Sequence, residues 1–156
     1  MIEQNFDHLI SEAVGTVLET MFFTAPLGPA EAVSDGPVLE ARVSFQGIYC
    51  GTLSVRLSEA GARILAAGFL GEDEDLLTDS ESSQAVCELA NMLCGMLVSK
   101  LATQGSFDLA APGLITAADQ SDSGDEYYLA AQQSCALEKG ALTVTLHLGA
   151  VHDPGK

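Results

Sequence analysis

A glutamate and an asparagine three positions apart, Glu88 and Asn91, lie in a segment whose apolar residues recur at helical spacing. With about 100° of rotation per residue, the pair falls within an arc of about 80° that also holds Gln84, Gly95 and Ser99. Residues three apart on a helix have Cβ atoms about 5–6 Å apart, so both side chains can contact one external target. A carboxylate pairs with cations, and a carboxamide both donates and accepts hydrogen bonds. The spacing therefore indicates that both side chains could bind the same external target.

The apolar residues of the same segment fall on the opposite side and predict its core face. They are Val86, Leu89, Ala90, Leu93, Leu97 and Leu101. Gly95 stands on the polar side, although a glycine inside a helix costs about 1 kcal/mol relative to alanine. Close approach of another molecule would explain that cost, and so would packing against a second helix. Taken alone, Glu-x-x-Asn is a common pattern, and an exposed pair needs no function.

Hydrophobic periodicity predicts the elements that hold this segment in place. Helices are expected over residues 4–22, 59–70 and 79–104, and strands over 30–34, 38–46, 50–57, 113–118, 126–136 and 141–149. Ser58 is expected to cap the second helix and Gly71 to end it, while Thr78 and Glu81 match a capping box for the third.

The order of these elements, helix then three strands, occurs twice. It predicts an α+β fold, with two long helices and a short helix packed on a largely antiparallel sheet of about six strands. The length of 156 residues fits one domain, expected over residues 1–150, with residues 151–156 as a flexible tail.

The chain carries 22 acidic and 6 basic residues, a net charge of −16, and its mean hydropathy is +0.25. Such a charge repels nucleic-acid backbones and anionic lipid surfaces, so neither is an expected partner. The N-terminal residues lack the pattern of a signal peptide, and no apolar stretch is long enough to cross a bilayer. A soluble, cytoplasmic protein is expected.

Other residues that could do chemistry have simpler explanations. The four cysteines, Cys50, Cys87, Cys94 and Cys135, form no Cys-x-x-Cys pair, so we expect reduced thiols and no metal site. The acidic residues after Gly71 are expected to form a solvated loop. The acidic stretch 119–126 resembles a calcium loop, but its twelfth position is Ala130 where such a loop needs glutamate, so a hairpin loop is favoured.

Residues 84–95 (Gln-Ala-Val-Cys-Glu-Leu-Ala-Asn-Met-Leu-Cys-Gly) resemble the active-site helix of the CheX, CheC and FliY family of chemotaxis phosphatases. That family has Asp or Ser, then Glu four residues later, Asn three after that, and a proline about twenty residues on. Here Pro112 follows Asn91 after 20 intervening residues. The stretch Phe45-Gln-Gly-Ile-Tyr-Cys-Gly-Thr-Leu-Ser-Val55 also resembles the family's glycine-bounded hairpin. The resemblance extends from the first helix to the last hairpin.

The resemblance implies a phosphatase that acts on the aspartyl phosphate of a CheY-like response regulator. Asn91 would position the attacking water, and Glu88 would dock on the receiver's lysine. Gln84, Gly95 and Pro112 would contact the partner. No cofactor is expected on this chain, since the receiver would bring its own magnesium ion. The resemblance also implies a homodimer that pairs through strand edges.

Two departures from the family pattern are visible in the sequence. The first helix carries no second Glu/Asn pair of the kind found in CheC-type members, so the chain resembles CheX. The first motif position holds Gln84 in place of Asp or Ser, which leaves open a module that binds the receiver without hydrolysing its phosphate. A scaffold protein of a chemotaxis or flagellar assembly is a third possibility.

Overall fold

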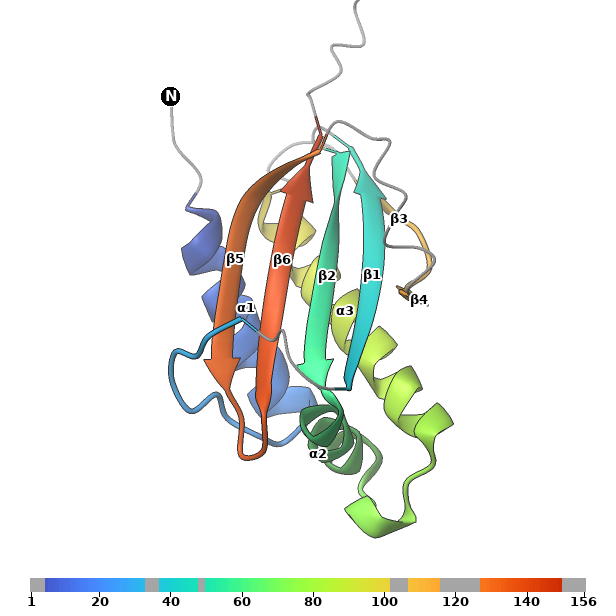
Figure 1. Cartoon of the computed structure of the whole chain (residues 1–156). Helices are drawn as coiled ribbons and strands as arrows, with labels where there is room; N and C mark the ends of the chain where they lie inside the picture. Colours follow the sequence, from blue (N-terminus) through green and yellow to red (C-terminus); the bar gives the residue numbers. More distant parts are fainter. Residues whose placement is uncertain (1–4, 33–36, 48–49, 102–106, 116–126, 150–156) are drawn as a thin grey trace, which may run out of the picture.

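The computed structural model describes residues 5–32, 37–47, 50–101, 107–115 and 127–149, which form helices and strands in two layers (Figure 1). The helices are α1 (Phe6–Met21), α2 (Glu59–Leu70) and α3 (Asp79–Leu101), with a 3-10 turn η1 (Glu74–Leu76) between the last two. The strands are β1 (Val38–Gln46), β2 (Cys50–Ser58), β3 (Asp108–Leu109), β4 (Gly113–Leu114), β5 (Tyr128–Ala136) and β6 (Ala141–Leu148).

The strands form one sheet in the order β3-β1-β2-β6-β5, and every pairing is antiparallel. β4 pairs with β1 beyond β3, so the two short strands share one edge of β1. Helices α1 and α3 lie behind this sheet, with α1 against β5 and α3 against β1 and β2 (Figure 1). The predicted α+β fold, with helices on one face of an antiparallel sheet, is confirmed.

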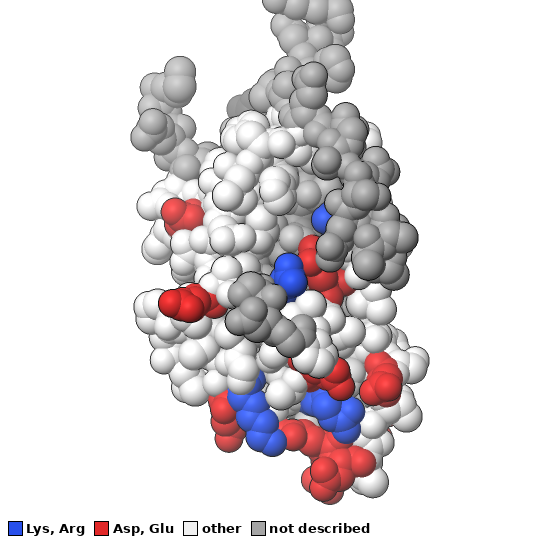
Figure 2. Space-filling model, viewed as in Figure 1, with Lys and Arg blue, Asp and Glu red and all other residues white. Residues whose placement is uncertain are grey.

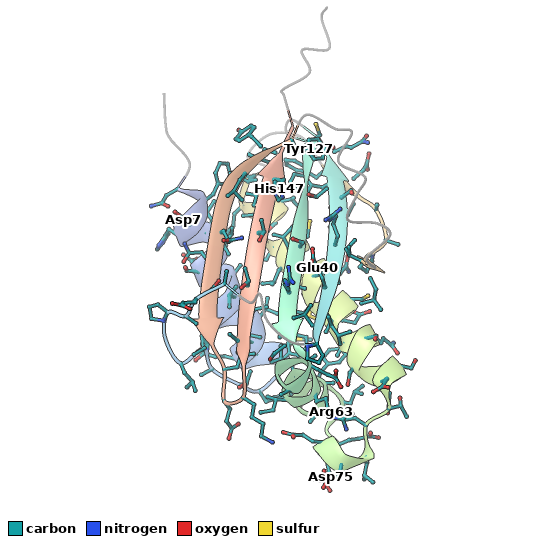
Figure 3. All side chains as sticks on the ribbon, viewed as in Figure 1. Asp7, Glu40, Arg63, Asp75, Tyr127 and His147 are labelled. Atoms are coloured by element: carbon teal, nitrogen blue, oxygen red, sulfur yellow. The ribbon has the colours of Figure 1, made fainter. Side chains whose placement is uncertain are left out.

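Alternation along the strands puts apolar side chains between the two layers. In β1, Ala41, Val43 and Phe45 are buried, and in β6 the same holds for Leu142, Val144, Leu146 and Leu148. The opposite face of the sheet is polar, because the intervening positions carry charged or hydroxyl side chains. Glu40 and His147 point outward from it in Figure 3. The sheet thus contributes one face to the core, and α1 and α3 complete that core.

The lower end of the molecule is fixed by α2 and the η1 turn. Arg63 donates a hydrogen bond of 2.6 Å to the backbone oxygen of Glu74, and Lys139 Nζ lies 3.0 Å from Glu74 Oε2. Figure 2 shows acidic and basic side chains gathered together at this end, where Figure 3 labels Arg63 and Asp75. The acidic loop after Gly71 is exposed, as expected, but these contacts pin it to α2 and to the turn between β5 and β6.

Some boundaries differ from the prediction. The strand expected over 30–34 is wrong in its described part, since residues 30–32 form no strand and only Pro29 makes an isolated bridge, to Cys135. The strand expected over 113–118 is reduced to β4 among its described residues, and β3 was not expected. The loop 119–126 and the tail 151–156 lie outside the described residues. Among the residues described, no helix is long and apolar enough to cross a membrane.

Candidate functional site

The helix α3 that carries the predicted site begins with the capping box expected from the sequence. Glu81 N donates to Thr78 Oγ1 at 3.1 Å, and Thr78 N donates to Glu81 Oε1 at 3.0 Å. These reciprocal bonds satisfy two backbone donors that the first turn leaves unpaired. Near the other end, Lys100 Nζ lies 2.6 Å from Glu12 Oε1 of α1. These contacts therefore hold α3 near both of its ends.

The sidedness predicted for α3 is confirmed. All six residues assigned to its core face are buried, and the structure adds Ser82, Ala85, Cys94 and Val98 to them. On the opposite side Gln84 and Ser99 are exposed, and Glu88, Asn91 and Gly95 are half-buried. We call these five residues the α3 stripe. Glu88 and Asn91 thus lie on the same side of α3, and each is partly exposed.

Neither side chain of the pair is engaged within the described part of the chain. Glu88 forms no ion pair there, and Asn91 neither donates nor accepts a hydrogen bond with a described residue. A carboxylate and an amide without partners among the described residues can bind an external ligand.

Gly95 is not explained by packing inside the molecule. A Cβ built on it would meet no atom within 4 Å in the described structure. Gly68 differs, because a Cβ on it would overlap with the backbone oxygen of Phe22. The alternative that Gly95 allows close packing of a second helix of this chain is therefore excluded for the described residues. The open space remains for a partner.

Pro112 lies on the short segment that joins β3 to β4 along the edge of β1. It is half-buried, and β4, which begins at the next residue, contacts α3. The structure thus brings this segment beside the site helix. Gln84 is exposed one turn before Glu88 and forms no hydrogen bond with any described residue. The five residues predicted for the site therefore come from α3 and from the segment next to it.

Three half-buried residues that the sequence did not single out flank the α3 stripe. Met92 and Met96 pack against the core on one side, and Cys87 lies on the other. Burial raises the pKa of the Cys87 thiol, and the neighbouring Glu88 carboxylate raises it further. The sequence could have indicated these three residues, because on the helical wheel they lie at the border of the α3 stripe. They give the site an apolar border, and the cysteine remains a neutral thiol.

Helix α1 offers no second pair of this kind. Asn5 caps the helix, because its Oδ1 accepts a hydrogen bond of 3.1 Å from His8 N. Glu12 is bound to Lys100, and this bond lowers the pKa of the Glu12 carboxyl, with His8 contributing less. Over the described ranges, no group of three or more His, Cys, Asp or Glu side chains is placed to hold a metal ion.

Comparisons with known proteins identify the family of this chain. The family model of the chemotaxis phosphatase CheX matches residues 39–132, more than half of the chain. No curated protein matches at a significant level.

Solved structures share the fold over almost the whole chain. The CheX protein of Vibrio vulnificus is 20% identical, with a TM-score of 0.75 over 95% of this chain and 99% of that one. The CheX-CheY-BeF3-Mg²⁺ complex of Borrelia burgdorferi matches with 19% identity and a TM-score of 0.70 over 95% of this chain and 100% of the matched one. A CheX of Desulfovibrio desulfuricans is 21% identical, with a TM-score of 0.66 over 93% and 99% of the two chains. Together with the α+β fold, the match to the family model over more than half of the sequence leads to one conclusion: this chain belongs to the CheX family of chemotaxis phosphatases.

Proposed function

We propose that this chain hydrolyses the aspartyl phosphate of a CheY-like receiver domain at the α3 stripe. One observation carries the proposal: Glu88 and Asn91 lie together on a partly exposed helix face without partners among the described residues, beside a glycine that leaves space for another backbone. An acyl phosphate is already reactive, so the reaction needs in-line geometry and charge neutralisation more than covalent catalysis.

Asn91 would position the attacking water. Its amide oxygen accepts a hydrogen bond from the water and its amide nitrogen can donate one, which fixes the water in line with the scissile bond. The water oxygen bonds to phosphorus while the bond from phosphorus to the aspartate oxygen breaks. The electron pair of that bond leaves with the aspartate carboxylate, and the proton of the water passes to the phosphate. A neutral amide suffices, because a loose transition state needs no strong base.

Glu88 would align the two proteins. Its carboxylate pairs with the lysine of the receiver's active site and so directs α3 toward the phosphate. An ion pair of this kind fixes the register of an interface even where its net contribution to affinity is small. The magnesium ion that neutralises the phosphate would be held by the receiver. Gly95 would admit the receiver's backbone, and Gln84 and Pro112 would contact it at either side of the pair.

The Borrelia structure supports the choice of partner, since that CheX protein forms a complex with CheY, BeF3 and Mg²⁺. The decisive experiment measures the lifetime of a phosphorylated CheY-like receiver with and without this chain. We expect substoichiometric amounts of the chain to shorten the lifetime, since each molecule turns over many receivers. An unchanged or longer lifetime with demonstrable binding would overturn the proposal.

Gln84 favours a second candidate function, in which the chain binds the receiver without hydrolysis. A glutamine replaces the family's Asp or Ser at an exposed position one turn from Glu88. Under this alternative the wild-type chain binds the phosphorylated receiver without shortening its lifetime. The variant Gln84→Asp would then gain the activity that the wild-type chain lacks.

We further propose that the protein acts in the cytoplasm as a homodimer that pairs through strand edges. The outer edge of β5 is covered near its end, where Leu27 N donates to Ala136 O at 2.8 Å and Ala30 N donates to Ser134 O at 3.2 Å. No described strand covers its first half. Sedimentation at several concentrations would reveal a monomer if this part of the proposal is wrong.

A further inference from the structure

A cavity of about 230 Å³ lies between α1 and the strands β5 and β6. Helix α1 passes behind these two strands, so the cavity is on the face of the sheet that the helices cover (Figure 1). Its apolar lining consists of Val14, Pro26, Pro29, Leu142 and Val144. We call it the α1–β5 cavity. None of the described residues that line it belongs to α3.

The connector between α1 and β1 forms one wall of the cavity, and that wall is held by backbone hydrogen bonds. Leu27 N donates to Ala136 O at 2.8 Å, and Ala136 N donates to Gly28 O at 2.8 Å. Pro26 and Pro29, on either side of these bonds, have fixed φ angles that restrict the backbone further. The wall is therefore tied to the edge of β5, and the cavity is formed without a ligand.

Two polar side chains of the cavity lining are joined across it. Ser11 Oγ, on α1, donates to Gln133 Oε1, on β5, at 3.2 Å. This bond orients the half-buried Gln133 side chain and leaves its amide nitrogen without a hydrogen-bond partner among the described residues. The serine oxygen uses its proton in the same bond and can still accept one. A donor and an acceptor thus stand side by side, and a carboxamide complements both.

The cavity lining is uncharged, although the chain carries 22 acidic and 6 basic residues. None of the described residues that line it is Asp, Glu, Lys, Arg or His. Moving an ionised group out of water into such a site costs far more than moving a neutral one, so the site favours a neutral ligand.

The volume of the cavity limits the size of its ligand. An apolar cavity of about 150 Å³ binds benzene, and sites for drug-sized molecules begin at about 300 Å³. A volume of about 230 Å³ therefore suits one six-membered ring with a short polar group, about ten non-hydrogen atoms in all.

We propose that the α1–β5 cavity binds a small neutral molecule with an apolar body the size of one ring and a carboxamide head. The apolar body packs against Val14, Leu142 and Val144. The carboxamide oxygen accepts a hydrogen bond from the amide nitrogen of Gln133, and its N–H donates to Ser11 Oγ. The inference stands independently of the proposed phosphatase reaction, because it uses no residue of the α3 stripe.

The test uses Cys135, which lines the cavity and is half-buried, as a reporter. Cys87 on α3 is also half-buried but lies outside the cavity, so it is the internal control. Mass spectrometry follows the rate at which methyl methanethiosulfonate modifies each thiol. The probes are phenylacetamide, its charged counterpart phenylacetate, and acetamide, which has the head alone.

We expect phenylacetamide to protect Cys135 in a saturable manner, with about tenfold slower modification at ten times its Kd. The rate at Cys87 should not change. Phenylacetate and acetamide at the same concentration should protect Cys135 far less, because one is charged and the other lacks the apolar body.

A pair of variants on β5 tests the proposed head contact. Gln133→Leu keeps the size of the side chain and removes the amide, so Kd for phenylacetamide should rise about three- to tenfold. Gln132→Leu is the matched control, since Gln132 lies on the opposite face of the sheet, where its Nε2 donates to Thr145 Oγ1 at 3.1 Å. It should leave Kd unchanged.

Several results would overturn the proposal. They are a lack of saturable protection at Cys135, equal protection by phenylacetate, equal slowing at Cys87, and equal Kd values for the two variants. If Gln133→Leu loses its cooperative thermal transition, the comparison of the three probes on the wild-type chain decides alone.

Discussion

Gly95 lies one turn beyond Asn91 on the exposed side of α3, and a Cβ built on Gly95 meets no described atom within 4 Å. Gly15, in the middle of α1, has the same open space. Both glycines lie inside helices, where alanine is favoured by about 1 kcal/mol. Glycine therefore destabilises the helix by a similar amount at both positions. Only Gly95 belongs to the proposed docking surface.

Replacing Gly95 with alanine should stabilise the protein and impair its function. We expect the Tm to rise by about 2–4 °C, because the helix gains about 1 kcal/mol without a clash inside the chain. Affinity for the phosphorylated receiver should fall by about tenfold, since an added methyl group in a close contact typically costs about 1–3 kcal/mol. Differential scanning calorimetry and fluorescence anisotropy measure the two effects.

Gly15→Ala is the matched control for this prediction. It should raise the Tm by a similar amount and leave receiver binding unchanged, because Gly15 lies on α1. If Gly95→Ala binds the receiver as tightly as Gly15→Ala does, the space at Gly95 is not used by the partner.

Buried Cys94 predicts a loss of stability at alkaline pH. Burial raises the pKa of this thiol to about 12, against 9.0 for an unperturbed cysteine. The unfolded chain loses the proton above pH 9, while the folded chain keeps it up to about pH 12. The stabilising contribution is thus fully present below pH 9 and is lost as the pH rises through that window.

Between pH 8 and pH 10 the free energy of unfolding should therefore fall by on the order of 1 kcal/mol through Cys94. Urea titrations at the two pH values measure this change. Cys94→Ala is less stable at both, because it leaves a small cavity, but it should lack this part of the pH dependence. An identical dependence in wild type and Cys94→Ala would show that the thiol titrates normally.

The sequence predicted α3 well because one physical signal dominates that helix. Its apolar residues repeat at helical spacing, and the capping box of Thr78 and Glu81 marks the residue at which the helix begins. Alternation in β1 likewise predicted which of its residues face the helices. These features depend on neighbours close in sequence, so no knowledge of the tertiary structure was needed.

Other features depend on contacts between distant residues, and the sequence could not predict them. The two-residue strands β3 and β4 exist because they pair with β1, which lies more than sixty residues earlier. The segment after Pro29 looked like a strand, but the chain makes only an isolated bridge there, and proline lacks the N–H that a ladder requires. The turn that ends α1 holds Phe23 with a φ of 54°, which was also unexpected because local preferences favour glycine at such a turn.

Glu88→Gln should weaken receiver binding and slow hydrolysis together. The substitution removes the charge but keeps the size of the side chain, so the lost interaction is the proposed ion pair with the receiver's lysine. We expect Kd to rise about tenfold, because truncating one partner of an interfacial charge pair typically costs 2 kcal/mol or more when buried and less when exposed. Titration of labelled receiver gives Kd, and phosphate release gives the rate.

Glu138→Gln serves as the control for net charge, since Glu138 is exposed in the turn between β5 and β6. It removes the same charge far along the sequence from the α3 stripe and should change neither quantity by more than about twofold. If both variants behave alike, Glu88 acts only through the long-range field of the protein.

Asn91→Ala should separate binding from catalysis. The substitution removes the amide that would hold the attacking water, so we expect hydrolysis of the receiver's aspartyl phosphate to fall by about 100-fold or more. Receiver affinity should change by less than about twofold, since a lost water contact affects the transition state more than the complex. Ser83→Ala, on α3 but outside the stripe, is the matched control and should retain full activity. Single-turnover dephosphorylation at saturating protein distinguishes the outcomes, and full hydrolysis by Asn91→Ala would disprove the assignment. A similar loss of activity in Asn91→Ala and Ser83→Ala would point instead to a general disturbance of the helix.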